Sequence, residues 1–195
     1  MSRLHARSLV LTVVFSAALA GGCAGRGPGS EASALDLEGS AVDPLGHGAR
    51  ATVLVFVASD CPISNRYAPE IRRIHDEFAA RGVATWLVYP NAADTPEKVR
   101  RHLADFGHPA PALRDPRHVL VRRAGATRTP EAALFAADGS LVYLGRIDDS
   151  FVAFGKMRPE PTVHDLREAL AATLSGERAP LSTTQAIGCT IAPAE

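Results

Sequence analysis

The stretch that determines the fold runs from Val53 to Ser64 and reads Val-Leu-Val-Phe-Val-Ala-Ser-Asp-Cys-Pro-Ile-Ser. Its first half is a continuous apolar, β-branched run, which is typical of a strand covered on both faces. Cys61 follows that strand, and Pro62 opens a predicted helix over residues 62–81. Unpaired backbone N–H groups and the positive end of the helix dipole favour a thiolate at this position and lower the cysteine pKa. The segment therefore predicts a reactive cysteine.

Strand-like and helix-like segments alternate on both sides of this stretch. The helix after Cys61 has apolar residues at Tyr67, Ile71, Ile74 and Phe78, which lie on one helix face. The other predicted elements are a hairpin at 34–42, a strand at 83–89, a helix opening at Thr95-Pro96, an edge strand at 111–113, a helical turn at 115–123, a hairpin of strands 131–136 and 141–147, and a last helix opening with a capping box at 162–165. This order predicts an α/β domain with a central mixed β-sheet flanked by helices on both faces.

Three local signatures in this order resemble the thioredoxin-like fold. They are Cys61 after the apolar strand, Pro69 eight residues later inside the helix, and Arg128-Thr129-Pro130 directly before the second hairpin. Within that fold, the chain is similar to the redoxin branch, which includes alkyl hydroperoxide reductase and thiol-specific antioxidant proteins. The resemblance covers residues 33–191 and implies one thioredoxin-like redoxin domain.

The resemblance also implies a substrate site. Pro130 is expected in the cis form against Cys61, and the backbone of Thr129 is expected to bind an extended substrate chain. Arg128 completes this predicted substrate-binding segment. The sequence leaves the net effect of neighbouring charges on the Cys61 pKa open, because Asp60 raises it whereas nearby arginines lower it.

Two departures from the family limit the predicted chemistry. Ser64 stands where thioredoxins have the second cysteine of Cys-x-x-Cys, so a mixed disulfide on Cys61 needs a resolving cysteine from elsewhere. Peroxiredoxins carry Pro-x-x-x-Thr-x-x-Cys, in which the threonine orients peroxide. Here Leu54 replaces that proline and Ala58 replaces that threonine, which argues against peroxidase activity.

The N-terminus predicts export. Arg3 and Arg7 precede an apolar run at 9–19, which has the length of a signal peptide and is too short to span a bilayer. The run leads into Leu19-Ala-Gly-Gly-Cys23, which resembles a bacterial lipobox and implies lipidation of Cys23. We therefore expect a signal peptide at 1–22, a flexible tether at 23–32, and a lipid-anchored protein of the cell envelope facing the periplasm. An ordinary secretory signal is the alternative.

Ala24 follows the cysteine that is expected to carry the lipid and, by resemblance to bacterial sorting, favours the outer membrane. The chain has 21 basic and 21 acidic residues with no basic stripe, so nucleic acid is not an expected partner. The histidines are scattered without short ligand spacing, and neither a metal nor a cofactor is expected.

The three cysteines of the chain define the functional alternatives. With Cys23 committed to lipid, Cys61 and Cys189 remain in an oxidising compartment as either one disulfide or two reactive thiols. The C-terminal tail at 177–195 has no regular pattern and is able to carry Cys189 across the domain.

We predict an envelope thiol–disulfide oxidoreductase that acts through Cys61, with Cys189 as its resolving cysteine. Its expected partners are protein thiols and disulfides, or a peroxide, together with an electron donor and the membrane that holds the lipid anchor. A thiol peroxidase in which Arg128 stabilises the departing charge is one alternative. A non-catalytic binding protein with a structural Cys61–Cys189 disulfide is the other.

Overall fold

The computed structural model describes residues 33–46, 48–108 and 110–194. The predicted signal peptide, the lipidated Cys23 and the tether lie outside the described residues. In the part of the chain that is described, no helix combines the length and apolar character needed to cross a bilayer.

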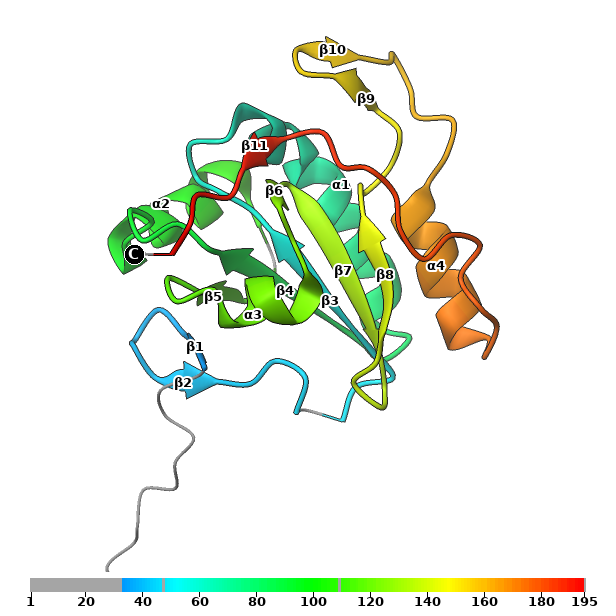
Figure 1. Ribbon diagram of the computed structural model, residues 1–195, viewed down its shortest axis with the longest axis horizontal. Helices are drawn as coiled ribbons and strands as arrows, with labels where there is room; N and C mark the ends of the chain where they lie inside the picture. Colours follow the sequence, from blue (N-terminus) through cyan, green and yellow to red (C-terminus); the bar gives the residue numbers. More distant parts are fainter. Residues whose placement is uncertain (1–32, 47, 109, 195) are drawn as a thin grey trace, which may run out of the picture.

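Seven strands form a mixed sheet in the order β2-β1-β5-β4-β3-β7-β8 (Figure 1). Strands β3, β4 and β5 are parallel, whereas β7 and β8 run antiparallel to their neighbours. All six residues of the central strand β3 are buried, as its continuous apolar sequence predicts. The strand bounds are β1 Ala34–Leu35, β2 Ala41–Val42, β3 Ala51–Phe56, β4 Val83–Tyr89, β5 Ala112–Arg114, β7 Glu131–Ala136 and β8 Leu141–Gly145.

Helices cover both faces of the sheet, which confirms the predicted thioredoxin-like α/β fold. One face packs α1 (Pro62–Ala79), α2 (Pro96–Phe106) and α4 (Asp165–Leu174), and the other packs α3 (Val119–Ala124). The predicted apolar face of α1 is buried against the first of these cores. Because β3 is covered on both sides, its carboxyl end is held rigidly where α1 begins.

The start of α4 differs from the prediction. The helix begins at Asp165 with His164 as its N-cap, and Thr162 does not cap it. The Thr162 hydroxyl instead donates to Asp149 Oδ2 at 2.6 Å, and the Thr162 backbone N–H donates to Oδ1 at 2.7 Å. The prediction of a capping box was wrong because the buried Asp149 carboxylate takes these donors.

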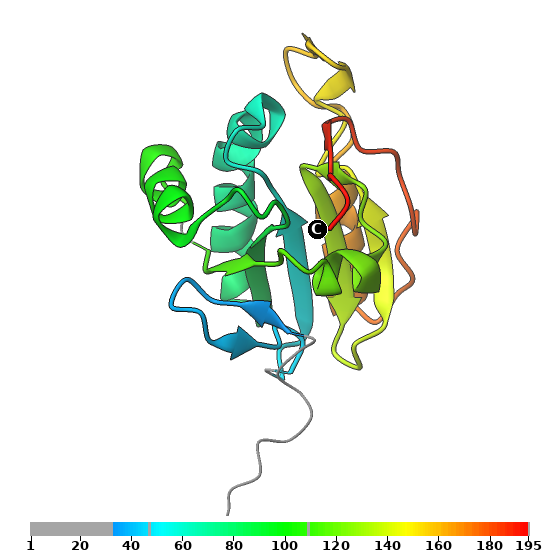
Figure 2. The same cartoon turned by 60° about the vertical axis from the view of Figure 1, so that its left-hand side comes forward.

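Two short additions to the fold gather at one end of the sheet. Strands β9 (Phe151–Ala153) and β10 (Lys156–Met157) form a hairpin between β8 and α4 that stands away from the sheet. Strand β11 (Cys189–Thr190) of the C-terminal tail pairs with β6 (Arg128–Thr129). Figure 1 and Figure 2 both place the hairpin and β11 at the same end of the molecule. The sequence pattern predicted neither the β9–β10 hairpin nor β11.

The C-terminal tail follows a defined path before it reaches β11. It runs along β8, where the Leu144 N–H donates to Ser182 O and the Thr184 N–H donates to Leu144 O, each at 3.0 Å. The Thr184 hydroxyl also makes a 2.6 Å hydrogen bond with the Tyr143 hydroxyl. These contacts direct the tail towards the end of the sheet where β3 meets α1.

Candidate active site

The junction of β3 and α1 holds Cys61 in a fixed position. Cys61 is the N-cap of α1, with extended backbone angles, and Pro62 occupies the first turn. The Cys61 N–H donates to Ala58 O at 3.1 Å, which closes the turn between strand and helix. Only 1% of Cys61 is exposed. The helix N-terminus therefore presents the sulfur from a rigid and buried frame.

The second component of the site is the Thr129–Pro130 peptide bond, which is cis as the family resemblance implied. The Cys61 Sγ lies 3.0 Å from Thr129 O and donates to it as a thiol. Thr129 and Pro130 are both buried. The predicted substrate-binding segment is therefore in direct contact with the predicted nucleophile.

The third component is the tail strand β11. Cys189 lies opposite Thr129 and Thr190 lies opposite Arg128 in an antiparallel pair. The pairing brings Cys189 Sγ to 2.8 Å from Cys61 Sγ, with both cysteines present as free thiols. Two cysteines 128 positions apart in the sequence thus form one dithiol pair.

The tail approaches the active site closely because of Gly188. A Cβ atom at this position would lie 2.2 Å from Thr129 O and 3.1 Å from Pro130 N. The predicted residue Arg128 fastens the same segment, since its Nη1 donates to Thr190 Oγ1 at 3.1 Å. The described hydrogen bonds of the Arg128 guanidinium go to the tail, so Arg128 holds β11 against β6.

The two thiols have opposite pKa shifts. Burial raises the pKa of Cys61, but the hydrogen bond from the Cys189 thiol and the backbone N–H of Ser64 outweigh burial and lower the pKa below its ordinary value. The pKa of Cys189 is raised to about 12 by burial, by its hydrogen bond to Cys61, and by the charges of Cys61 and Asp60. The Asp60 charge therefore acts on Cys189. Of the two thiols, Cys61 is therefore the one that loses its proton more readily.

A buried polar network behind the site was not predicted. The Asn65 Oδ1 lies 2.8 Å from His102 Nε2, and His102 Nδ1 lies 2.8 Å from the Tyr89 hydroxyl. The Asn65 amide donates to Ser59 O at 3.4 Å, and the Ser59 hydroxyl donates to Asp94 Oδ1 at 2.5 Å. The network supports the turn that carries Cys61. Its five residues lie on five different elements or loops, so no local sequence pattern predicts it.

One group of possible metal ligands occurs among the described residues. Glu70, Asp148 and His164 place ligand atoms within 4.8 Å of one another. The Glu70 carboxylate already binds Arg73 and Arg167, and Asp148 Oδ1 accepts the Tyr67 hydroxyl at 2.8 Å. These carboxylates are satisfied by protein donors, so we assign no metal to them.

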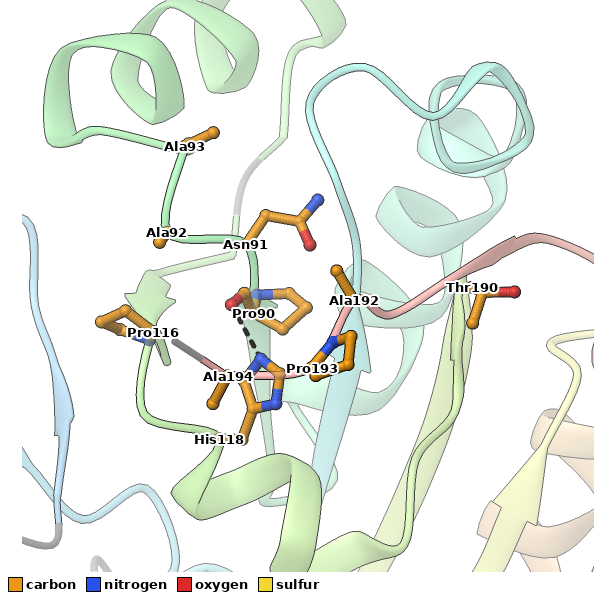
Figure 3. Close-up of a pocket in the computed structure, with 10 residues that line it drawn as sticks. All are labelled: Pro90, Asn91, Ala92, Ala93, Pro116, His118, Thr190, Ala192, Pro193 and Ala194. Carbon is orange, nitrogen blue, oxygen red and sulfur yellow. Dashed lines mark hydrogen bonds between the residues drawn. The ribbon is translucent and has the colours of Figure 1, made fainter.

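A cavity of about 250 Å³ lies where the tail passes beyond the active site (Figure 3). Thr190, Ala192 and Pro193 line it from the tail, and Pro90 and His118 line it from the body. The figure shows the only hydrogen bond among the residues drawn, 3.2 Å between His118 Nε2 and Pro90 O. Proline and alanine dominate the lining, which suits a packing site for the tail better than a catalytic pocket.

Comparison with known proteins agrees with this geometry. A family model described as Redoxin matches residues 27–153, a region that includes Cys61 and ends before Cys189. No curated protein matches the chain.

Solved structures give the same fold. The chain is 27% identical to an uncharacterized conserved protein from Geobacillus kaustophilus, with a TM-score of 0.72 over 82% of this chain and 86% of that one. A hypothetical protein from Sinorhizobium meliloti 1021 is 26% identical, with a TM-score of 0.69 over 82% of this chain and 91% of that one. A secreted disulfide oxidoreductase from Mycobacterium tuberculosis shares the fold at 18% identity and a TM-score of 0.50, over 74% of this chain and 94% of that one. The chain belongs to the Redoxin family of thioredoxin-like redox proteins.

Proposed function

We propose that the protein is a thiol–disulfide oxidoreductase in which Cys61 is the nucleophile and Cys189 the resolving cysteine. The observation that carries this proposal is the dithiol pair itself. The sulfurs are 2.8 Å apart, and the pKa of Cys61 is lowered while that of Cys189 is raised. Exchange needs one thiolate that attacks and a second thiol that releases the product.

The reaction proceeds in two exchanges. The Cys61 thiolate attacks one sulfur of a substrate disulfide, forms a mixed disulfide, and expels the other substrate sulfur as a thiolate. Cys189 then loses its proton and attacks Cys61 Sγ, which expels the second substrate sulfur. The substrate disulfide gains two electrons and two protons, and Cys61 and Cys189 become a disulfide. An external dithiol reverses these steps to regenerate the pair, and the reduction potentials of the partners set the direction.

Access to Cys61 requires movement of the tail. Cys61 is 1% exposed, and Cys189 lies against it. A substrate disulfide therefore reaches the nucleophile when β11 lifts from β6, and β11 has only two residues. The return of β11 then delivers Cys189 for the second exchange. The tail thus both covers Cys61 and carries the resolving cysteine, Cys189.

The proposed location is the cell envelope. It rests on the signal-like segment at 1–22 and on Cys23 as the lipid-bearing residue, which would hold the domain at a membrane facing the periplasm. This compartment is oxidising, so a reversible cysteine pair has substrates there.

The test is the redox state and turnover of the protein. We expect purified, reduced protein to lose 2 Da on reaction with a stoichiometric protein disulfide and to regain it with dithiothreitol. We expect it to catalyse insulin reduction with an external dithiol, and Cys61→Ser to abolish both results. A permanent Cys61–Cys189 link that mild dithiothreitol leaves closed would instead support the structural disulfide. Turnover of hydroperoxide without turnover of disulfides would support the peroxidase.

A further inference from the structure

Large apolar side chains are exposed mainly on the β9–β10 hairpin. Val152, Phe154 and Met157 are 50%, 66% and 45% exposed, and we call Phe154 and Met157, which line the cavity beside the hairpin, the hairpin surface. Among the described residues, only two other large apolar side chains have comparable exposure, Leu141 and Leu181. Because exposed apolar groups gathered in one place are costly in water, such a patch marks a binding surface.

A cavity of about 390 Å³ lies between this hairpin and the start of α1. Pro62, Ile63 and Arg66 line it from α1, and Phe151, Phe154 and Met157 line it from the hairpin. Pro62 and Ile63 follow Cys61 directly in the chain. The cavity therefore begins next to the reactive cysteine, and its volume suits a bulky side chain.

The hairpin is held in position at its base. The Tyr67 hydroxyl of α1 donates to Asp148 Oδ1 at 2.8 Å, and the Tyr67 and Phe151 ring centroids are 5.4 Å apart. On the returning side, the Arg158 N–H donates to Ser150 O at 2.7 Å. These contacts fix the cavity before any partner binds, which lowers the entropic cost of binding.

The opposite side of the active site is already occupied. Strand β11 covers β6, and the Ile191 N–H donates to Thr127 O at 3.0 Å. While the tail is in place, an incoming polypeptide cannot pair with β6. The hairpin side is thus the side of the active site that the tail leaves uncovered, and a partner bound there is in place when β11 lifts and exposes Cys61.

Charge adds a second requirement for the occupant. Arg66 lines the cavity and is exposed, and no ion pair or hydrogen bond engages its side chain within the described ranges. Lys156, on the hairpin, is also exposed, and no ion pair or hydrogen bond with another described residue engages its side chain. Two unpaired cations beside an apolar hollow favour a partner that joins a bulky apolar side chain to a carboxylate.

We propose that the hairpin surface and its cavity bind the polypeptide substrate of Cys61. The substrate class is an extended segment in which a bulky apolar residue and an acidic residue lie beside the cysteine of its disulfide. The apolar side chain enters the cavity, and the carboxylate binds Arg66. This inference rests on the proposed thiol–disulfide exchange and narrows its substrates from disulfides in general to protein disulfides of this type.

The experiment compares substrates and variants by second-order rate constants of disulfide reduction, using the full mature chain. The substrates are a disulfide-linked peptide with Leu and Glu beside its cysteine, the same peptide with Ser and Gln, and hydroxyethyl disulfide. The variants are Phe154→Ser combined with Met157→Ser, Arg66→Gln, and the control Leu141→Ser. Leu141 has an exposed fraction of 42%, similar to that of Met157. It begins β8 at the end of the sheet away from the hairpin (Figure 1). Thermal unfolding verifies that each variant is folded.

We expect the Leu–Glu peptide to react about tenfold faster than the Ser–Gln peptide, a discrimination typical of one apolar pocket. We divide the rate constant for the Leu–Glu peptide by that for hydroxyethyl disulfide. This ratio should fall about tenfold in the double variant and about threefold in Arg66→Gln. It should stay constant in Leu141→Ser. If the unsubstituted protein reduces none of the disulfides, the proposed function is wrong. If it reduces them all but the double variant keeps the same ratio, only the present inference fails. Loss of binding to anionic lipid vesicles with an unchanged ratio would also overturn it, in favour of a membrane-binding hairpin.

Discussion

The two cysteines of the active site lie on very different parts of the molecule. Cys61 follows a strand buried over its whole length and begins an 18-residue helix. Cys189 lies on a two-residue strand of the tail, and Ile187 and Ile191, two positions before and after it, are partly buried against the two cores. Moving Cys61 requires opening the core, whereas releasing Cys189 requires breaking the β11–β6 pairing and these smaller apolar contacts.

This difference matches the requirements of disulfide exchange. The nucleophile must be held in one geometry where the helix N-terminus stabilises its thiolate. The resolving thiol must leave so that substrate enters, and must return so that product leaves. In the proposed mechanism the rigid junction holds Cys61, and the tail, paired to β6 through β11, carries Cys189 away from it and back.

The largest effect is expected from removing the thiol of Cys189. A second variant then supplies a new thiol on the rigid helix α1. Cys189→Ser should slow multiple turnover by about a hundredfold or more, because the mixed disulfide on Cys61 has no internal thiol to release it. Mass spectrometry after quenching should show that mixed disulfide. Adding Ser64→Cys to this variant places a thiol on α1 three residues after Cys61 and should restore turnover. Unchanged turnover in Cys189→Ser would remove Cys189 from the mechanism.

A substitution at Gly188 should detach the tail. In Gly188→Ala the new Cβ would lie 2.2 Å from Thr129 O, so β11 cannot pair with β6. We expect alkylation of Cys61 by iodoacetamide to accelerate about thirtyfold, which corresponds to about 2 kcal/mol of local opening free energy. Gly46→Ala is the matched control, since its Cβ would come no closer than 3.4 Å to any atom. Equal alkylation rates in both variants would show that the tail does not cover Cys61.

The junction itself is probed through Ser64. The pKa of Cys61 is lowered although burial raises it. The Ser64 hydroxyl is buried and makes no hydrogen bond to another described residue, which leaves it free to donate to a Cys61 thiolate. Ser64→Ala removes that donor, so the Cys61 pKa should rise and the thiolate fraction at a given pH should fall. The rate of the first exchange increases as pH rises through this pKa, and the variant profile should be displaced to higher pH.

At a pH below both pKa values, Ser64→Ala should react about three- to tenfold more slowly, which corresponds to about 1 kcal/mol, the net contribution of one ordinary hydrogen bond. Thiolate absorbance measured against pH reports the shift directly. Above both pKa values the two proteins should react alike. A profile displaced to lower pH would contradict the role of Ser64.

The smallest effect is expected from the side-chain contact that fastens the tail. Arg128→Gln loses the 3.1 Å hydrogen bond to Thr190 Oγ1. One partly exposed hydrogen bond contributes about 1 kcal/mol, so alkylation of Cys61 should accelerate about threefold to fivefold. Arg101→Gln on the exposed surface of α2 should leave the rate unchanged. A large loss of activity in Arg128→Gln with no change in alkylation would assign Arg128 to substrate binding.

Much of the fold was predictable because its signals are local. Continuous apolar runs at β3 and β4, and the four-three-four spacing of apolar residues on α1, report burial directly. The cis bond before Pro130 followed from resemblance. By contrast, the hairpin at β9 and β10 was missed, because short strands that extend into solvent lack the alternating pattern of a half-buried strand.

The sequence by itself determined the sheet, the helices, and a cysteine at a helix N-terminus, since each depends on side chains close together in the chain. Only the tertiary structure established that Cys189 reaches Cys61 and that an apolar hairpin stands beside the pair. The two cysteines are 128 positions apart. Their contact depends on backbone pairing of the tail, which any residue except proline can form, and such pairing leaves no pattern in the sequence.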